Sequence, residues 1–296
     1  MTLESSLRRL LTGIRVLPRR LSLSTPGVQA TAPMLRGVWG AALHDLDSQA
    51  YLTVFEGEGR STRRSPAFIL RPAPYDPEDA PALEWVSFGA GLRHDALLLR
   101  AWDIASGMGL GPDRQRFHVR VLRLLGPDGQ PCESSGADTA WPLSEAAWPL
   151  AGPPASTPCR LTFPAPLRLL RRHRLLAHPT LADLVVAGAR RLQPLLTPED
   201  QEQLAALRPQ LLDLAQSIAT LPWQGERLDL VRYSARQQSE IEMRGVTGHL
   251  DLPEGPGDLW PLLAAAQWLH LGKGAVVGLG QLVVEPLEPA EGRQAG

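Results

Sequence analysis

The stretch "MLRGVWGAALHDLDSQAY", residues 34–51, carries the first clear helical pattern of the chain. Five of its apolar residues recur at intervals of three and four and therefore share one face of a helix: Leu35, Val38, Trp39, Ala42 and Leu46. His44 falls off that face. The pattern predicts a helix that buries one side and leaves a histidine accessible on another.

Strand-like segments flank this helix. An extended piece, "RVLPRRLSLS", precedes it, and "PAFILRP" and "LEWVSFGA" follow it. Next come a helical stretch, "DALLLRAWDIAS", and "QRFHVRVLRLL", in which Phe117, Val119 and Val121 alternate as in a strand with one buried side. The order strand, helix, strand, strand, helix, strand predicts a ferredoxin-like split βαβ fold for this half.

A proline-rich segment, "AGPPASTP" at residues 151–158, divides the 296-residue chain near its middle. We therefore expect two domains, residues 1–150 and 159–296, joined by this linker.

The second half also mixes strands and helices. It begins with the strand-like "CRLTFPAPLRLL" and a helix capped by Thr180 and Asp183. The "TPED" motif starts another helix, which Pro209 should kink or split. Two strands follow, then "DLWPLLAAAQWLHL", a helix apolar nearly all round and stopped by Gly272, and finally "AVVGLGQLVVEP", expected to be a glycine-punctuated strand. The fold class is α+β.

Composition excludes several classes of protein. The sequence is 44% hydrophobic and 21% charged with a net charge of −1, as in soluble globular proteins. No stretch approaches the roughly 18 consecutive apolar residues of a membrane span, and no secretory signal opens the chain. Cys132 and Cys159 are isolated and the seven histidines are scattered, so we expect neither a metal site nor a cofactor. These features predict a cytoplasmic protein without membrane contact.

The only lysine of the chain, Lys273, lies between two glycines in "LHLGKGAVVGLGQ". A helix runs into these glycines, so its partially negative carbonyl end faces the loop and cannot attract an anion. The attraction would come from Lys273, as a compact cation or a general acid, and from nearby arginines. Gly272, Gly274, Gly278 and Gly280 allow close approach, either of two backbones or of backbone and nucleic acid.

Several motifs of this chain resemble those of the CRISPR precursor-RNA processing endoribonucleases of the RAMP superfamily (the Cas-six family). The similarity covers residues 33–286. Within the family, this chain is similar in particular to the branch whose members carry an arginine-tyrosine-serine motif and a terminal glycine-rich loop. The motifs that carry it, in order, are "LRGVWGAALHDL", "YLTVFEG", "SFGAGL", "GMGLGPDRQRFHVRVL", "FPAPLRLL", "VRYSARQQSEIEMRGVTGHL", "WLHLGKG" and "VVGLGQLVVEP".

The resemblance implies two tandem ferredoxin-like (RAMP or RRM-like) domains, binding of CRISPR repeat RNA, and metal-independent cleavage that yields guide RNA (crRNA). The ribose 2′-hydroxyl would attack the adjacent phosphate and leave a 2′,3′-cyclic phosphate. The alternative is a RAMP subunit that grips the 3′ handle of crRNA within an effector complex, together with other Cas proteins, and does not cut it. The sequence leaves the oligomeric state open.

The resemblance also implies catalytic residues. His44 matches the usual general base on or beside the first helix; alternatively it is a helical histidine paired with Asp45 or Asp47. Tyr51 would orient the hydroxyl or pack in the core. Arg36 would hold the scissile phosphate or face solvent.

Basic residues of the second half form the candidate RNA-binding surface. "LRLLRRHRLL" is the best candidate to bind an RNA stem, through Arg168, Arg171, Arg172 and Arg174; the alternative is a solvated loop. Arg232 and Arg236 lie on one side of a strand, where they would follow the RNA backbone. His270, within the apolar helix, is interpreted as a hydrogen-bonded core histidine.

Overall fold

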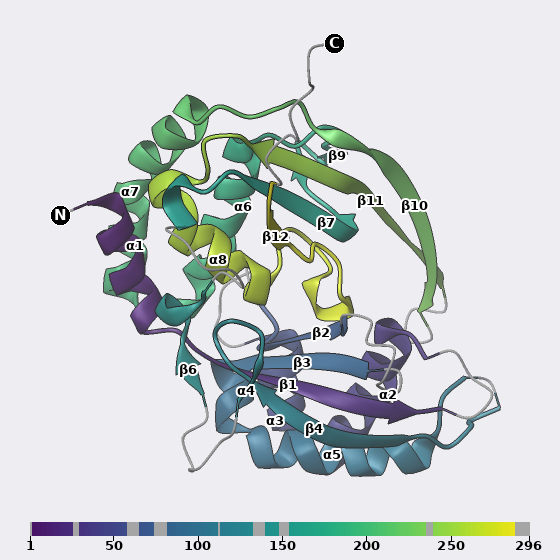
Figure 1. The fold of residues 1–296 in the computed structure, drawn as a ribbon. Coiled ribbons are helices and arrows are strands. Elements are labelled where there is room, and N and C mark those ends of the chain that lie inside the picture. Colours follow the sequence, from purple (N-terminus) through teal and green to yellow (C-terminus); the bar gives the residue numbers. More distant parts are fainter. Residues whose placement is uncertain are drawn as a thin grey trace.

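The computed structural model describes residues 2–25, 30–57, 65–73, 82–111, 113–132, 140–147, 154–234 and 239–287. The chain forms two larger antiparallel sheets and one of two strands, and one helix lies between the two larger sheets (Figure 1). Residues 151–153 of the expected linker lie outside the described residues and 154–158 include a 3-10 turn (Pro154–Ser156), and the division into domains at 151–158 stays a prediction.

The first sheet has the predicted ferredoxin-like order. Its strands pair antiparallel in the spatial order β2-β3-β1-β4-β5, and the short β6 pairs with the start of β1. The elements are β1 (Arg15–Ser24), α2 (Ala32–Leu46), β2 (Phe68–Pro72), β3 (Ala82–Phe88), α5 (Asp95–Met108), β4 (His118–Leu125), β5 (Pro131–Cys132) and β6 (Trp141–Pro142).

Helices α2 and α5 cover one face of this sheet and bury an aromatic cluster. Trp39 of α2 stacks on Trp102 of α5 with ring centroids 4.7 Å apart, and meets Trp85 and Phe68 of the sheet edge-on. The Trp39 indole donates to the carbonyl of Leu98, so its polar atom is satisfied. The predicted apolar face of residues 35–46 is therefore the face that builds this core.

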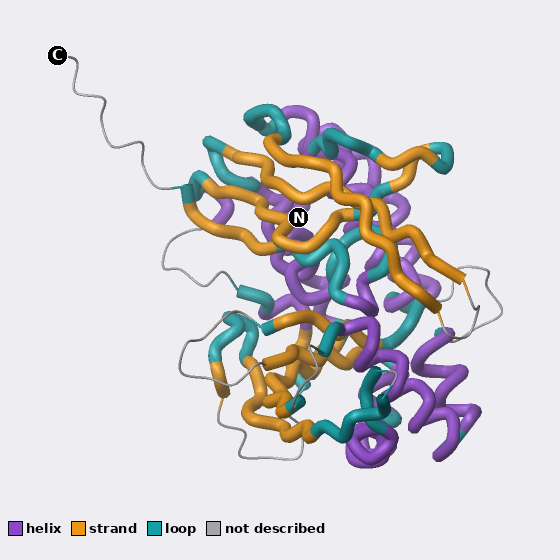
Figure 2. The backbone as a smooth tube through the Cα atoms, turned by 90° about the vertical axis from the view of Figure 1, so that its right-hand side faces the viewer, coloured by secondary structure: helices purple, strands orange, loops and turns teal. Residues whose placement is uncertain are grey.

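The second sheet repeats the same arrangement, in the order β10-β11-β7-β12. Figure 2 shows its long β10–β11 hairpin descending beside the first half. The elements are β7 (Cys159–Leu167), β8 (Leu170–Arg171), β9 (Arg174–Leu175), α6 (Leu181–Leu192), α7 (Pro198–Ser217), β10 (Gln224–Ser234), β11 (Ser239–Leu252), α8 (Trp260–Leu269) and β12 (Val283–Pro286). The capping box of Thr180 and Asp183 begins α6 as predicted.

Helix α8 lies between the two sheets (Figure 1), and nearly every one of its residues is buried. This position explains the apolar surface that the sequence gives it on all sides. Helix α1 (Leu3–Thr12) packs against α7 and α8, so the first helix of the chain joins the core of the second half.

A row of charged side chains on the first sheet faces α8. Arg20, Glu84 and Arg71 are direct cross-strand neighbours on β1, β3 and β2. The buried Glu84 carboxylate accepts from Arg20 Nη2 at 2.9 Å and from Arg71 Nε at 2.7 Å. Arg71 Nη1 then donates to the carbonyl of Gln267 in α8 at 2.6 Å and approaches His270 Nε2 at 3.5 Å. This network joins the two halves.

A second arginine, Arg191 in α6, also links the two halves. Arg191 of α6 donates from Nε to the Leu269 carbonyl at 2.9 Å and from Nη1 to Ser65 Oγ at 2.7 Å. Burial lowers the pKa of Arg191 to about 10, so its guanidinium stays charged at neutral pH.

The glycine-rich loop (residues 270–282) connects α8 to β12. Its backbone is bound to the end of β7 and to the residues after it: Lys273 N donates to the Arg168 carbonyl at 3.1 Å, and Gly280 N to that of Pro166 at 3.0 Å. A Cβ at Gly272 would lie 2.5 Å from the Arg168 carbonyl oxygen, and one at Gly280 1.8 Å from that of Leu271. The close approach predicted for these two glycines is therefore between protein backbones.

Helix α7 runs unbroken from Pro198 to Ser217, so Pro209 does not split it; Pro209 and Ala205, whose carbonyl loses its helical partner, both face solvent. Three other expectations about local structure are wrong. Residues 275–282 form a 3-10 turn (Ala275–Val277) and irregular loop rather than a strand. Val121 is exposed, not buried. Helix α8 ends at Leu269, and the residue that leaves the helix with a left-handed φ of 56° is His270, not Gly272.

None of the described helices combines the length and apolar character needed to cross a bilayer.

Acidification should weaken the fold through His270. Burial, reinforced by the charge of Arg71, lowers the pKa of His270 well below its ordinary value of 6.5. At a pH between the lowered pKa of the folded chain and the ordinary pKa of the unfolded chain, the unfolded chain binds a proton that the folded chain does not. The free energy of unfolding should therefore fall by up to about 1.4 kcal/mol per pH unit as the pH drops below about 6.5. Urea titrations from pH 7.5 to 5 on wild type and His270→Asn measure this slope; equal slopes would contradict it.

Gly280→Ala should destabilise the fold by at least about 1–3 kcal/mol, because its φ of 68° disfavours a side chain and the added Cβ meets a carbonyl oxygen. Gly37→Ala is the matched control. Gly37 lies exposed within α2 with nothing near its missing Cβ, so alanine there should stabilise by roughly 0.5–1 kcal/mol. Thermal unfolding should show a lower Tm for Gly280→Ala and a slightly higher Tm for Gly37→Ala. An unchanged Tm in Gly280→Ala would contradict the close backbone packing at Gly280.

Candidate active site

One side of α2 carries three residues spaced by four positions, Arg36, Gly40 and His44, which therefore lie on neighbouring turns. Two aromatic residues pack over this side from the next segment. Tyr51 ends the short helix α3 (Ser48–Tyr51), and Phe55 lies in the π-helical turn Leu52–Glu56. The helix and the turn together build a compact cluster.

The rings of this cluster are in contact. His44 meets Tyr51 edge-on with ring centroids 5.3 Å apart, and Tyr51 stacks on Phe55 at 5.1 Å. The Arg36 guanidinium lies 5.3 Å from the centroid of the Phe55 ring, within cation–π range. The structure thus brings together three residues predicted separately from the sequence: Arg36, His44 and Tyr51.

Gly40 makes this packing possible. A Cβ at Gly40 would lie 2.8 Å from Cε1 of Phe55 and 3.4 Å from Cε2 of Tyr51. The sequence reasoning missed Gly40 and Phe55, although their spacing of four from Arg36, His44 and Tyr51 was a signal for both.

The His44 ring is accessible. Its side chain is 59% exposed, and Nδ1 lies 3.9 Å from Asp45 Oδ1, beyond hydrogen-bond distance. Asp47 is used elsewhere, because its Oδ1 accepts from the backbone N–H groups of Gln49 and Ala50, both at 2.9 Å, and caps α3. Of the two carboxylates that could pair with His44, Asp47 is bonded to backbone and Asp45 makes only a contact at 3.9 Å.

The glycine-rich loop reaches this region from the other half of the chain. Its 3-10 turn Ala275–Val277, flanked by Gly274 and Gly278, contacts both α2 and β2, and Val276 packs against the apolar core of the first half (Figure 1). Lys273 is exposed two residues before the turn. The fold therefore places the loop that bears the single lysine against the helix that bears Arg36 and His44.

The basic run of residues 168–174 is a β-hairpin rather than a solvated loop. Strands β8 and β9 pair, and Arg172 and His173 form the turn with φ of 49° and 64°. The side chains of Arg171, Arg172 and Arg174 are exposed, and Arg171 is paired with Asp183 of α6. Arg168 precedes the hairpin, where its carbonyl accepts from Lys273 N. The hairpin and Lys273 thus flank one another.

The remaining predicted residues lie on or beyond β10. Arg232 is in the strand, with its backbone paired opposite Ile241 of β11. Arg236 lies outside the described residues. The outer end of the β10–β11 hairpin lies beside α2 in both views (Figures 1 and 2).

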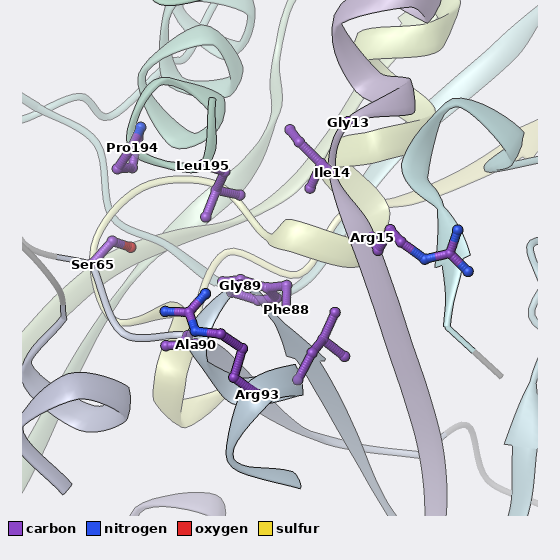
Figure 3. Close-up of a pocket in the computed structure, with 12 residues that line it drawn as sticks. Gly13, Ile14, Arg15, Ser65, Phe88, Gly89, Ala90, Arg93, Pro194 and Leu195 are labelled. Atoms are coloured by element: carbon purple, nitrogen blue, oxygen red, sulfur yellow. The ribbon is translucent and has the colours of Figure 1, made fainter. Parts of the chain in front are cut away.

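A cavity of about 300 Å³ lies between the halves, away from this cluster (Figure 3). It is lined by apolar and polar residues of both halves, and the Arg93 side chain extends toward Ser65. None of the predicted site residues lines it. Within the described part of the chain, no three His, Cys, Asp or Glu side chains gather in the manner of a metal site.

Part of the chain matches a known protein family. Residues 161–282 match the family model of the CRISPR-associated endoribonuclease Cas6. No curated protein gives a significant sequence match. The predicted residues Arg36, His44 and Tyr51 precede the matched segment.

Solved structures share the fold over almost the whole chain. A product complex of Cas6 (TTHB231) aligns with a TM-score of 0.57 and 19% identity, over 93% of this chain and 100% of that one. The Thermus thermophilus Cas6 (TTHB231) itself gives 0.54 and 17%, over 92% and 98%. A product complex of Cas6 (TTHA0078) gives 0.53 and 16%, over 92% and 99%. The second half of the chain thus matches the Cas6 family model, and nearly the whole chain shares the fold of these Cas6 structures.

Proposed function

We propose that this protein is a metal-independent endoribonuclease that binds and cleaves CRISPR repeat RNA to make mature crRNA, and that it acts in the cytoplasm. The observation that carries the proposal is the meeting of α2, with Arg36 and His44 on one side, and the loop that bears Lys273. Structural neighbours named as Cas6 product and substrate-mimic complexes support the same substrate class.

The cluster supplies the groups that the reaction needs. The 2′-oxygen forms a bond to phosphorus while the bond from phosphorus to the 5′-oxygen breaks, leaving a 2′,3′-cyclic phosphate. His44, the accessible imidazole, takes the proton from the 2′-hydroxyl, because histidine exchanges protons near neutrality. Tyr51, held against both His44 and Phe55, orients that hydroxyl.

Two cations flank the reacting phosphate in this proposal. Arg36, fixed over Phe55, binds a non-bridging oxygen. Lys273 stabilises the charge that develops on the phosphorane and gives the proton to the leaving 5′-oxygen. Because Lys273 lies on a loop from the other half, the complete site requires both halves of the chain.

The exposed arginines of the β8–β9 hairpin bind the repeat RNA next to Lys273. Arg171, Arg172 and Arg174 project from a two-stranded support rather than a flexible segment, which suits a fixed path for a phosphate backbone. Arg232 and Arg236 are further proposed contacts to the RNA backbone. Other Cas proteins are further proposed partners, because a Cas6-RT-Cas1–Cas2 complex is among the structural neighbours.

Purified protein should cut its own repeat RNA in EDTA, at one position. A single deoxyribose on the 5′ side of the cut should abolish the product, because it removes the attacking hydroxyl. Tight binding of RNA that stays intact would instead support the non-cleaving RAMP subunit and overturn the nuclease.

His44→Ala should slow single-turnover cleavage by roughly 10²-fold or more and leave RNA affinity nearly unchanged. His118→Ala is the control, since His118 is an exposed histidine on β4 outside the cluster. Equal rates for the two variants would remove His44 from the mechanism.

Replacing the hairpin arginines should lower both the affinity for repeat RNA and its salt dependence, by roughly one unit of slope per lost phosphate contact. The variant combines Arg171→Ala, Arg174→Ala and Arg172→Asn, because asparagine tolerates the left-handed backbone of the turn. Arg100→Ala, on the exposed side of α5, is the control. Filter binding over a range of KCl concentrations measures the slopes, and an unaltered slope would exclude the hairpin.

A further inference from the structure

His270 is the first residue after α8 and is fully buried between the two halves. Its φ of 56° is unfavourable for a side-chain-bearing residue. Glycine would fit this backbone without strain, so the presence of an imidazole here calls for a role of its side chain.

The partners of the two ring nitrogens fix the state of the imidazole. Nδ1 lies 3.0 Å from the carbonyl oxygen of Leu279, which can only accept, so Nδ1 carries a hydrogen. Nε2 faces Arg71 Nη1 at 3.5 Å, and a guanidinium can only donate, so Nε2 carries none. The ring is therefore neutral and is one tautomer. Burial and the charge of Arg71 lower the pKa of His270, which agrees with this state.

Each ring nitrogen points to a different part of the fold. Through Arg71 the imidazole is linked to Glu84 and to the first sheet, which carries α2 on its opposite face. Through the Leu279 carbonyl it is linked to the far side of the glycine-rich loop, next to the point where Gly280 is bound to Pro166 and Leu271. The side chain thus spans the base of the loop.

We propose that His270 is a positioning residue that holds the Lys273 loop against α2, through its Nδ1–H bond to Leu279 and its Nε2 contact with Arg71. Without the Nδ1–H bond, the loop keeps its backbone bonds and the packing of Val276 but loses the side-chain bond from His270 to Leu279, and the turn Ala275–Val277 is held less firmly on the first half. The assignment of Lys273 to the reaction rests on the proposed function; the placement of the loop does not.

Two substitutions separate the two ring nitrogens. In His270→Asn the side-chain amide takes the place of Nδ1–H, and the backbone strain at φ 56° and ψ 163° is common to both variants. In His270→Gln the amide reaches toward Arg71 and abandons Leu279. We expect His270→Asn to cleave within about threefold of wild type. His270→Gln should lower kcat by about 10- to 100-fold, because the catalytic loop is displaced, with a smaller change in KM.

Two measurements test the placement without relying on cleavage. Imidazole ¹⁵N NMR of the wild-type protein should show a neutral His270 with hydrogen on Nδ1 at pH 6–7. Hydrogen exchange of the Leu271, Lys273 and Gly280 amides should be slow in wild type and His270→Asn, and at least tenfold faster in His270→Gln.

An Nε2–H tautomer, a protonated ring at pH 6, or equal exchange in the two variants would overturn the proposal. Altered exchange in a protein that binds repeat RNA but never cuts it would contradict the proposed function and leave the positioning role standing. Normal exchange with normal cleavage in His270→Gln would contradict the positioning role alone.

Discussion

Helix α8 has no polar side, and only a place between two apolar surfaces can bury all of it. Both ferredoxin-like sheets supply such a surface, so the helix fixes how the halves meet. The chain that leaves α8 must then emerge at the junction of the halves. Its next residues are the glycine-rich loop, which for this reason contacts α2 and β2. The position of Lys273 beside the first half is thus a consequence of where an apolar helix can be buried.

Ionic contacts make that junction specific. Apolar packing tolerates sliding, whereas Arg71 must meet Glu84, the Gln267 carbonyl and the His270 ring at once. The cross-strand register of β1, β3 and β2 places Arg20 and Arg71 on either side of one carboxylate. A shift of either strand by one residue would turn these charges toward the aromatic core under α2.

The order of elements in both halves could be predicted from periodicity, because α2, α5 and the strands each bury one regular face. The conformation of the glycine-rich loop could not be predicted in this way. Its apolar "AVV" and "LVV" segments look alike in sequence, and only tertiary contacts bend the first into a 3-10 turn. For the site, the family resemblance pointed to Arg36 and His44, and the single lysine between glycines pointed to Lys273. Phe55 and Gly40 act through shape rather than chemistry, so only their spacing of four from the other site residues could point to them. The role of His270 depends on Arg71, 199 positions away. The roles of all these residues in the reaction stay predictions.

Helix α1 has a separate consequence. It lies at the start of the chain but packs on α7 and α8, while β1, directly after it, is a central strand of the first sheet. The polypeptide therefore passes between the halves at residues 13–15 as well as in the middle of the sequence. Cutting only the middle connection would leave a nicked molecule whose C-terminal fragment lacks α1, a helix of its own lobe that stays on the N-terminal fragment.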